Sequence, residues 1–482
     1  MLFNSLEFAV FFPIVFFIYW LTGKNLKFQN SFILVSNYIF YGWWDWRFLS
    51  LIFLSTLEDY FVAMKIKNTS DERKRKMWLL VSIVFNLGIL GFFKYYNFFI
   101  DNFITAFTLF GIRLNIRSLN IILPVGISFY TFQTMSYTID VYKRKYEPTR
   151  DFISFAAFVS FFPQLVAGPI ERAANLLPQF HVKRTFDYGR AVDGMKQILW
   201  GLFKKIVVAD NCAAYVNYVF GNYQNQTGST LLLAAVFFAF QIYGDFSGYS
   251  DIATGTGKLL GFNLMHNFNY PYFSRDIAEF WRRWHISLTT WFRDYVYIPL
   301  GGSRVSKGKV LRNTFIIFLI SGFWHGANWT FIIWGAIHAA LFLPLILLKK
   351  NRKYTNTVAE GRFLPNIKEV FQMCLTFMLV LVGWIFFRAE NIKQAFEYFT
   401  GIANKSLFSL ALLYNKRIAL MNMIIIVAML IVEWTGRNNQ FGLEKFAGTL
   451  KKPYRWIIYL LIVFILLMYF KTEGTPFIYF QF

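Results

Sequence analysis

Charged residues are scarce in this sequence. Aspartate, glutamate, lysine and arginine make up 16% of its 482 residues, whereas a soluble globular domain usually carries about 25%. Hydrophobic residues account for 56% of the chain and aromatic residues for 21%, and apolar runs recur from end to end. This composition excludes an ordinary soluble protein. It predicts an all-α polytopic membrane protein, with residues 1–482 in a single membrane-embedded domain.

Acidic residues are scarcer still than basic ones. The chain has 26 of them against 49 lysines and arginines, so its formal net charge is +23. In a soluble protein this excess would suggest a nucleic-acid partner. Here the basic residues occupy short turns between apolar runs, which is typical of cytoplasmic loops that face anionic lipid. We therefore expect membrane lipid, and no nucleic acid, to be the partner of most of this charge. A basic cytoplasmic side would also favour an anionic substrate.

Cysteine is nearly absent. Cys212 and Cys374 lie far apart and lack metal-ligand spacing, so the sequence indicates neither a disulfide framework nor a metal site. The N-terminus lacks the basic residues and the small-residue cleavage site of a secretory signal peptide. We therefore expect its first apolar run to be a retained membrane span.

Basic loops orient the apolar runs. Residues 65–76 contain six lysines and arginines, and residues 349–362 are also strongly basic. The positive-inside rule places both loops in the cytoplasm, and counting spans from them puts both termini outside. The main apolar runs are residues 8–21, 31–44, 48–64, 77–93, 231–243, 312–324, 329–348, 370–387, 418–432 and 456–470.

The pattern of spans breaks up between residues 97 and 170. Residues 97–110 are amphipathic, Pro124 and Gly126 weaken the next helix, and Pro163 interrupts a run that is too short to span comfortably. Irregular backbone at membrane depth is tolerated only against protein or a wet cavity. Residues 123–172 therefore favour broken or re-entrant helices that line an interior, with two ordinary kinked spans as an equal alternative.

A dense cluster of tryptophan, arginine and histidine occupies residues 274–330. On a helical wheel, residues 277–292 form an amphipathic helix with Arg282 and Arg283 off its apolar face and His285 at the edge of that face. Its apolar face holds Ile277, Phe280, Trp281, Trp284, Leu288 and Trp291. Such a helix is too charged to span and suits the membrane interface. Its arginines either anchor it to lipid phosphates or bind the phosphates of an anionic donor, with His285 near the reaction path.

His325 is a stronger candidate for catalysis. The dozen residues from Arg312 to Trp324 would extend less than about 20 Å as a helix, short of the roughly 30 Å hydrocarbon core. A titratable residue at that depth suggests a functional role. The alternative is a structural histidine whose ring nitrogens are hydrogen-bonded within the protein. Neutral imidazole can take a proton from a hydroxyl that attacks a carbonyl. No Gly-x-Ser-x-Gly motif or cysteine nucleophile accompanies it, which favours direct base catalysis.

The other histidines and two acidic residues have simpler interpretations. We expect His338 to be a buried or lumen-facing polar contact, and His181 and His266 to be structural. Asp245 and Asp251 could orient a histidine, although capping or ion pairing is the more common role of such residues.

At these residues the sequence resembles the membrane-bound O-acyltransferase (MBOAT) superfamily. It looks most like the bacterial branch of alginate O-acetyltransferases and related peptidoglycan and polysaccharide O-acetylation proteins. The resembling stretches are residues 2–5, 162–170, 280–288, 297–302 and 322–327. Their combination is specific, whereas any one of them alone would not be.

The resemblance implies a fold and a function. The fold would be an MBOAT-like helical bundle around a central tunnel, with re-entrant and interfacial helices. The family's signature histidine corresponds to His325 and its second histidine to His285. We expect Arg282 and Arg283, with Trp281 and Trp284 beside them, to contact the acyl donor.

The resemblance also implies substrates, partners and a location. Acetyl-CoA would be a substrate rather than a permanently bound cofactor. The acyl group would cross the bacterial inner membrane, typically to a periplasmic partner acyltransferase, and reach a polysaccharide or peptidoglycan acceptor.

Two other functions stay open at this point. One is D-alanyl transfer to a cell-envelope polymer from a carrier protein, in another branch of the same superfamily. The other is a non-catalytic transporter or scaffold. The absence of the internal repeats common in transporters argues against it, as does the tryptophan-arginine-histidine cluster.

Overall fold

The described part of the chain is entirely helical. The computed structural model describes residues 1–166, 168–409, 411, 416–445, 450–471 and 477–478, and they contain no strand. Residue 167, within the resembling stretch 162–170, lies outside them. The all-α prediction is confirmed. The chain forms two compact units, residues 1–191 with 256–265, and residues 192–255 with 266–482. Whether these units act as one membrane domain stays a prediction.

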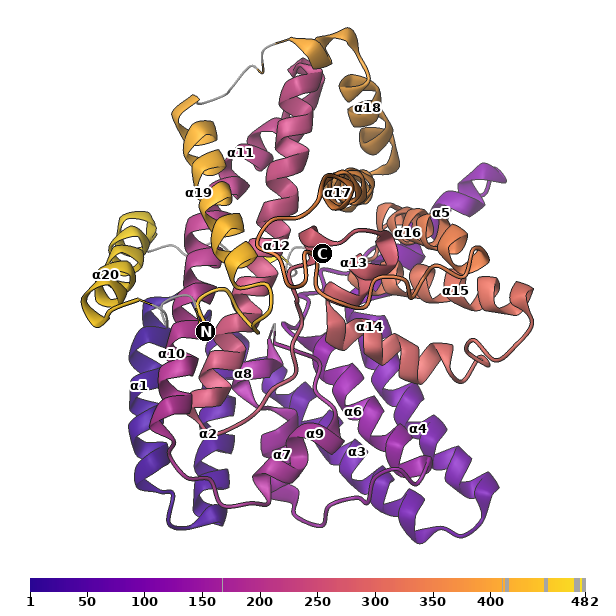
Figure 1. The fold of residues 1–482 in the computed structure, drawn as a ribbon. Coiled ribbons are helices and arrows are strands. Elements are labelled where there is room, and N and C mark those ends of the chain that lie inside the picture. Colours follow the sequence, from indigo (N-terminus) through magenta and orange to yellow (C-terminus); the bar gives the residue numbers. More distant parts are fainter. Residues whose placement is uncertain (167, 410, 412–415, 446–449, 472–476, 479–482) are drawn as a thin grey trace. The chain divides into compact units, whose positions relative to one another are not determined.

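The first unit contains the N-terminal helices (Figure 1). Its elements are α1 (Leu6–Leu21), α2 (Leu26–Asp45), η1 (Trp46–Phe48), α3 (Leu49–Asn68), α4 (Glu72–Leu90), η2 (Gly91–Tyr95), α5 (Tyr96–Leu109), α6 (Ile127–Tyr142), α7 (Phe152–Val159), α8 (Phe162–Leu165), α9 (Ala173–Leu176) and η3 (Leu177–Phe180). Helices α3, α4 and α6 pack against one another. The carboxylate of Asp59 joins α3 to α4, because it accepts hydrogen bonds from Ser82 Oγ (2.6 Å) and Asn86 Nδ2 (3.0 Å) of α4.

The interruptions expected between residues 123 and 172 are present. Helices α7, α8 and α9 are short, and α6 is buried along nearly its whole length. Pro124 and Gly126 do not weaken α6, because the helix starts after them. Gly126 has φ +74°, and a Cβ there would lie 2.6 Å from the carbonyl oxygen of Leu165. Only glycine fits such a position, so this residue fixes where α6 begins.

The second unit contains both leading histidine candidates. Its elements are α10 (Tyr188–Leu202), which begins in the first unit, η4 (Phe203–Ala209), α11 (Asp210–Gly221), η5 (Tyr223–Asn225), α12 (Gly228–Leu259), which ends in the first unit, η6 (Pro271–Phe273), α13 (Ile277–Arg283), α14 (Ile286–Phe292), η7 (Arg293–Tyr297), α15 (Lys307–His325), α16 (Trp329–Leu347), α17 (Ile367–Arg388), α18 (Ile392–Ile402), η8 (Lys405–Phe408), α19 (Lys416–Thr435) and α20 (Lys452–Tyr469). Helices α15 and α16 lie side by side (Figure 1). A Cβ on Gly322 would lie 2.2 Å from the carbonyl oxygen of Phe331, and one on Gly335 would lie 2.3 Å from that of Phe318. These two glycines therefore allow the helix backbones to approach closely.

The stretch 277–292 is not one continuous helix, so that prediction is wrong. It forms α13 and α14, separated at His285, whose backbone is left-handed (φ 42°, ψ 54°). The N–H of Ile286 donates to the carbonyl oxygen of Asn267 (2.9 Å) instead of continuing the helical ladder. Both short helices are largely buried, whereas an interfacial helix would expose its polar face.

The basic pair Lys204 and Lys205 is buried. Both lie on the π-helical segment η4, with 3% and 1% exposure. Lys204 pairs with Asp251 (2.6 Å) and Lys205 with Asp245 (2.7 Å), both on α12. Ion pairing is therefore the role of these two aspartates.

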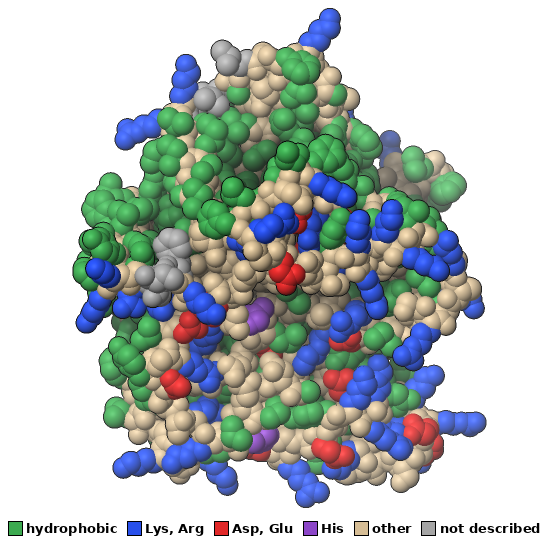
Figure 2. Space-filling model, viewed as in Figure 1, with side chains coloured by type: hydrophobic (Ala, Val, Ile, Leu, Met, Phe, Trp, Pro, Cys, Tyr) green, Lys and Arg blue, Asp and Glu red, His purple; other side chains and the backbone are tan. Residues whose placement is uncertain are grey.

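Several helices are suited to cross a membrane. Within the described residues, six helical segments have sufficient length and hydropathy, and α1 and residues 152–165 are shorter apolar segments. Figure 2 shows hydrophobic side chains over α19 and α20, and lysine and arginine side chains along the 349–362 segment. The helices support a multi-pass membrane protein.

Candidate active site

His325 lies at the C-terminal end of α15, inside an aromatic cluster. It is 3% exposed. Its ring centroid lies 5.0 Å from those of Trp324 and Trp334 and 5.2 Å from that of Phe387. The next residue, Gly326, leaves room for the ring of Phe331, because a Cβ there would lie 2.1 Å from it. The end of α15 is thus packed tightly, which limits where the imidazole can move.

His285 reaches the same cluster from the break between α13 and α14. Its ring centroid lies 5.9 Å from that of Trp324 and 4.5 Å from that of Phe246. The indole of Trp324 therefore contacts both imidazoles. The structure brings together two histidines that are 40 positions apart in the sequence.

The environment of His285 determines its protonation state. Burial lowers the pKa of this imidazole to about 3, so the ring is neutral at physiological pH. Its Nδ1 accepts a hydrogen bond from the N–H of Leu288 (3.3 Å). A neutral imidazole that accepts through Nδ1 carries its hydrogen on Nε2. His285 is therefore arranged to donate a hydrogen bond from Nε2.

The two candidate donor-binding arginines are held differently. Arg283 is buried and donates to Glu279 (2.9 Å) and to backbone carbonyl oxygens, including that of Asn356 (3.1 Å). Arg282 is exposed and donates to the carbonyl oxygens of Asn351 (2.7 Å) and Tyr354. Of the two guanidinium groups, that of Arg282 is thus the one exposed to solvent. A role of either arginine in donor binding stays a prediction.

The two candidate tryptophans line the aromatic cluster. Trp281 contacts the rings of Trp334 (5.6 Å) and His338 (5.0 Å). Trp284 contacts the ring of Trp384 (4.9 Å). Both are buried, so they support the candidate site from α13 and the residue that follows it.

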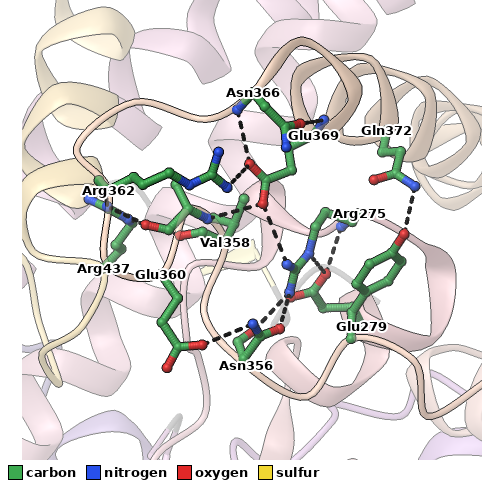
Figure 3. A network of polar contacts seen from close by, with 12 residues as sticks. Arg275, Glu279, Asn356, Val358, Glu360, Arg362, Asn366, Glu369, Gln372 and Arg437 are labelled. Atoms are coloured by element: carbon green, nitrogen blue, oxygen red, sulfur yellow. Dashed lines mark hydrogen bonds and ion pairs between the residues drawn. The ribbon is translucent and has the colours of Figure 1, made fainter.

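A polar network fixes the basic segment that follows α16 (Figure 3). Arg275 donates to Glu279 (3.0 Å) and to the side chain of Asn356 (3.0 Å). Arg362 donates to Glu369 (2.9 Å), and Arg437 donates to the carbonyl oxygens of Val358, Ala359 and Arg362. The segment is therefore held against α13, α17 and the residues after α19.

His338 belongs to the same cluster, although sequence reasoning gave it a minor role. It is fully buried on α16, and its ring centroid lies 5.0 Å from that of Trp334, which also contacts His325. Neither ring nitrogen has a hydrogen-bond partner among the described residues. Its expected burial is confirmed. In the sequence, the membership of His338 in this cluster could have been inferred from the recurrence of tryptophan followed by histidine, at Trp324-His325 and again at Trp334 and His338.

Sequence reasoning also missed a pocket in the second unit. Residues of α10, η4, α12, the 266–270 segment, α19 and the 440–442 segment line it. Lys204, Asp251 and Glu433 give it charge. Acidic residues within the otherwise apolar helices α12 and α19 were the feature of the sequence that could have indicated this pocket. No group of three potential metal ligands occurs in the described ranges.

Comparison with known proteins gives consistent matches. The model of the membrane-bound O-acyltransferase family matches residues 148–387. The chain is 41% identical over 401 residues to a probable alginate O-acetylase AlgI of Pseudomonas aeruginosa, which covers 83% of this chain and 74% of that protein. It is 35% identical over 452 residues to a peptidoglycan O-acetyltransferase of Helicobacter pylori, covering 88% and 83%. Its identity to a teichoic acid D-alanyltransferase of Bacillus subtilis is lower, 28% over 286 residues, and this match covers 56% of this chain and 70% of that protein.

Proposed function

The chain belongs to the membrane-bound O-acyltransferase family, and from this membership we propose that it transfers an acetyl group from acetyl-CoA for O-acetylation of an exported polysaccharide or peptidoglycan. It is a multi-pass membrane protein and an O-acyltransferase, and its relatives acetylate polymers. In the proposal, acetyl-CoA binds on the cytoplasmic side of the bacterial inner membrane. The acetyl group leaves on the outer side, to a periplasmic acyltransferase that passes it to the polymer.

The observation that carries the proposal is the shared contact of His285 and His325 with Trp324. In the proposed step, His325 accepts the proton of the acceptor hydroxyl while the oxygen of that hydroxyl bonds to the thioester carbonyl carbon. Negative charge develops on the carbonyl oxygen, and His285 donates a hydrogen bond to it from Nε2. The carbon–sulfur bond then breaks, and the leaving thiolate takes the proton from His325.

Replacing His325 tests this assignment. We expect His325→Ala to lower transfer of labelled acetyl from acetyl-CoA by about 10²- to 10⁴-fold, which is the usual contribution of a general base. His181→Ala is the matched control, because His181 lies in the first unit and contacts Thr149. Unchanged transfer by His325→Ala, at equal protein level in the membrane, would contradict the proposal.

The identity of the acyl donor distinguishes acetylation from D-alanyl transfer. Transfer from acetyl-CoA by the purified protein, without a carrier protein, would exclude D-alanyl transfer from a carrier. The greater identity to the acetylating relatives favours acetyl-CoA. Family membership likewise favours an enzyme over a transporter or scaffold.

A further inference from the structure

The first unit contains two acidic residues that the proposed acyl transfer does not use. Glu58 and Asp59 are neighbours at the middle of α3, a helix of 20 residues. At about 1.5 Å per residue, each lies roughly 14 Å from the nearer end of the helix. Helices α4 and α6 pack against α3 (Figure 1). A carboxyl group at this depth in a membrane protein is costly unless a cation, a proton or hydrogen-bond donors compensate it.

Asp59 is fully buried and has its donors in place. Its Oδ1 accepts a hydrogen bond from Ser82 Oγ (2.6 Å), and its Oδ2 accepts one from Asn86 Nδ2 (3.0 Å). The amide of Asn86 is oriented in turn, because its Oδ1 accepts from the hydroxyls of Ser55 (3.0 Å) and Thr134 (3.3 Å). Both carboxyl oxygens of Asp59 are therefore acceptors, as in an ionised carboxylate.

Glu58 has no such donors. Both of its carboxyl oxygens are buried, and neither has a hydrogen-bond partner among the described residues. No basic group acts on Glu58 or Asp59. Another buried oxygen without a partner in the described ranges is that of Thr131, one turn before Thr134 on the same face of α6. Buried oxygen atoms thus outnumber the donors that could satisfy them.

The face of α3 that carries Glu58 is apolar and exposed. Leu54, four residues before Glu58, is 49% exposed, and Phe61, three residues after it, is 59% exposed. Residues at these spacings share one face of a helix, and the exposed apolar face of a membrane protein contacts lipid. An ionised Glu58 would therefore lie between lipid and a second carboxylate, without a cation to balance either charge.

The carboxyl groups of Glu58 and Asp59 are within hydrogen-bonding reach of each other. Two ionised carboxylates are both acceptors and repel each other at such a distance. A single proton removes the repulsion and supplies the missing donor. Because Ser82 and Asn86 already donate to both oxygens of Asp59, the proton belongs on Glu58.

We infer that Glu58 and Asp59 form a proton-binding site, in which Glu58 carries the proton at neutral pH and donates it to the carboxylate of Asp59. The ligand is the proton itself, and the site connects proton binding to the packing of α3 on α4. Loss of the proton would place two negative charges side by side and weaken that packing. The inference does not rest on the proposed function, since the acyl-transfer step returns its proton to the leaving thiolate.

The charged side chains of the neighbouring elements lie toward the ends of those elements. The elements packed against α3 are α2, α4, α6, α7 and η1. Their charged residues, with the cap of α7, are Lys27, Asp45, Arg47, residues 72–76, Asp140 and Asp151. None of these acts on Glu58 or Asp59, whereas the charge of Asp59 acts on the hydroxyl of Tyr137 on α6. A tyrosine is neutral near pH 7, so the carboxyl pair alone determines the charge of the site.

Infrared difference spectroscopy of the purified full-length protein at about pH 7.5 tests the inference. The C=O band of a protonated carboxyl is separate from the bands of a carboxylate, and an ordinary glutamate is ionised at this pH. The difference between wild type and Glu58→Gln should contain one protonated-carboxyl band. Glu7→Gln is the matched control, because Glu7 is an exposed residue in the first turn of α1, and its difference should contain carboxylate bands. Carboxylate bands in the Glu58→Gln difference would overturn the inference.

The pH dependence of stability provides an independent measurement. In the unfolded chain Glu58 is ionised above about pH 4.3, whereas the folded chain keeps the proton, so folding takes up one proton. The equilibrium constant for folding of wild type, relative to that of Glu58→Gln, should therefore fall about tenfold per unit of rising pH, or about 100-fold between pH 5.5 and pH 7.5. Glutamine is neutral and can donate to Asp59 from Nε2, so the variant should fold. Equal pH dependence of wild type and Glu58→Gln would overturn the inference, and Glu7→Gln should behave as wild type.

Discussion

His285 and His325 contact the same indole, but the chain holds them in different ways. His325 ends a long helix, whereas His285 lies at a left-handed break and caps the following helix through Nδ1. This difference supports different roles. His285 has its Nδ1 occupied and donates from Nε2, while His325 is the proposed base.

The protonation of His285 makes protein stability depend on pH. Its pKa in the folded protein is about 3, against 6.5 as a free side chain, so below pH 6.5 the unfolded chain binds a proton that the folded chain does not. The free energy of unfolding therefore falls as pH drops, by about 1.4 kcal/mol per unit. We expect wild-type protein to lose about 2 kcal/mol more than His285→Gln between pH 7.5 and pH 5. Denaturation at both pH values measures this difference, and equal losses would contradict the neutral assignment.

The sequence identified the two histidines for different reasons, and it could not identify everything around them. His325 follows an apolar run, and a titratable residue in that position can be recognised from the linear sequence alone. The left-handed break at His285 depends on the carbonyl of Asn267, and the burial of Lys204 depends on Asp251 of α12. These partners are distant in sequence, so the local pattern predicted one continuous helix over residues 277–292 and did not indicate that Lys204 is buried.

Close contacts between helices place the aromatic cluster. Gly383 of α17 faces His338 of α16, and a Cβ at position 383 would lie 2.6 Å from His338 Nε2. Gly383→Ala should therefore destabilise the protein by about 1–3 kcal/mol through overpacking. The loss should shrink in the His338→Ala background, because the clashing ring is gone. Gly88→Ala is the control, since nothing lies within 4 Å of a Cβ there.

This prediction is checked by a double-mutant cycle on thermal stability. Additive effects of Gly383→Ala and His338→Ala would show that the two helices do not meet at this contact.

Helix α13 also depends on one buried carboxylate. Glu279 is 1% exposed and pairs with Arg275 (3.0 Å) and Arg283 (2.9 Å). Glu279→Gln would leave the buried guanidinium group of Arg283 without its counter-charge and Arg275 with only its longer ion pair to Glu369 (3.8 Å), so we expect a loss of about 3–5 kcal/mol. Thermal denaturation measures the loss. Glu397→Gln is the comparison, because the partner of Glu397 in its 3.7 Å ion pair, Lys393, is exposed, and it should cost no more than about 1 kcal/mol. Equal costs would show that the α13 pairing is not buried as described.

At the scale of the whole molecule, composition predicted the architecture best. The excess of apolar over charged residues led to an all-helical, multi-pass protein, and the helices agree with the apolar runs. Where the runs were interrupted between residues 123 and 172, the sequence correctly indicated broken helices. The polar pocket was missed because its lining comes from six separate segments, and no single run contains enough of it.

From the basic loops and the position of His325 we propose that acetyl enters from the cytoplasmic side and leaves on the outer side through a step that needs His325. The most direct test uses right-side-out membrane vesicles that carry the native envelope polymer and the periplasmic acyltransferase on their outer side and are loaded with labelled acetyl-CoA. We expect hydroxylamine-releasable label on the outer polymer with the wild-type protein, and at least about 10²-fold less label with His325→Ala. Equal labelling by the two proteins at equal abundance would contradict it.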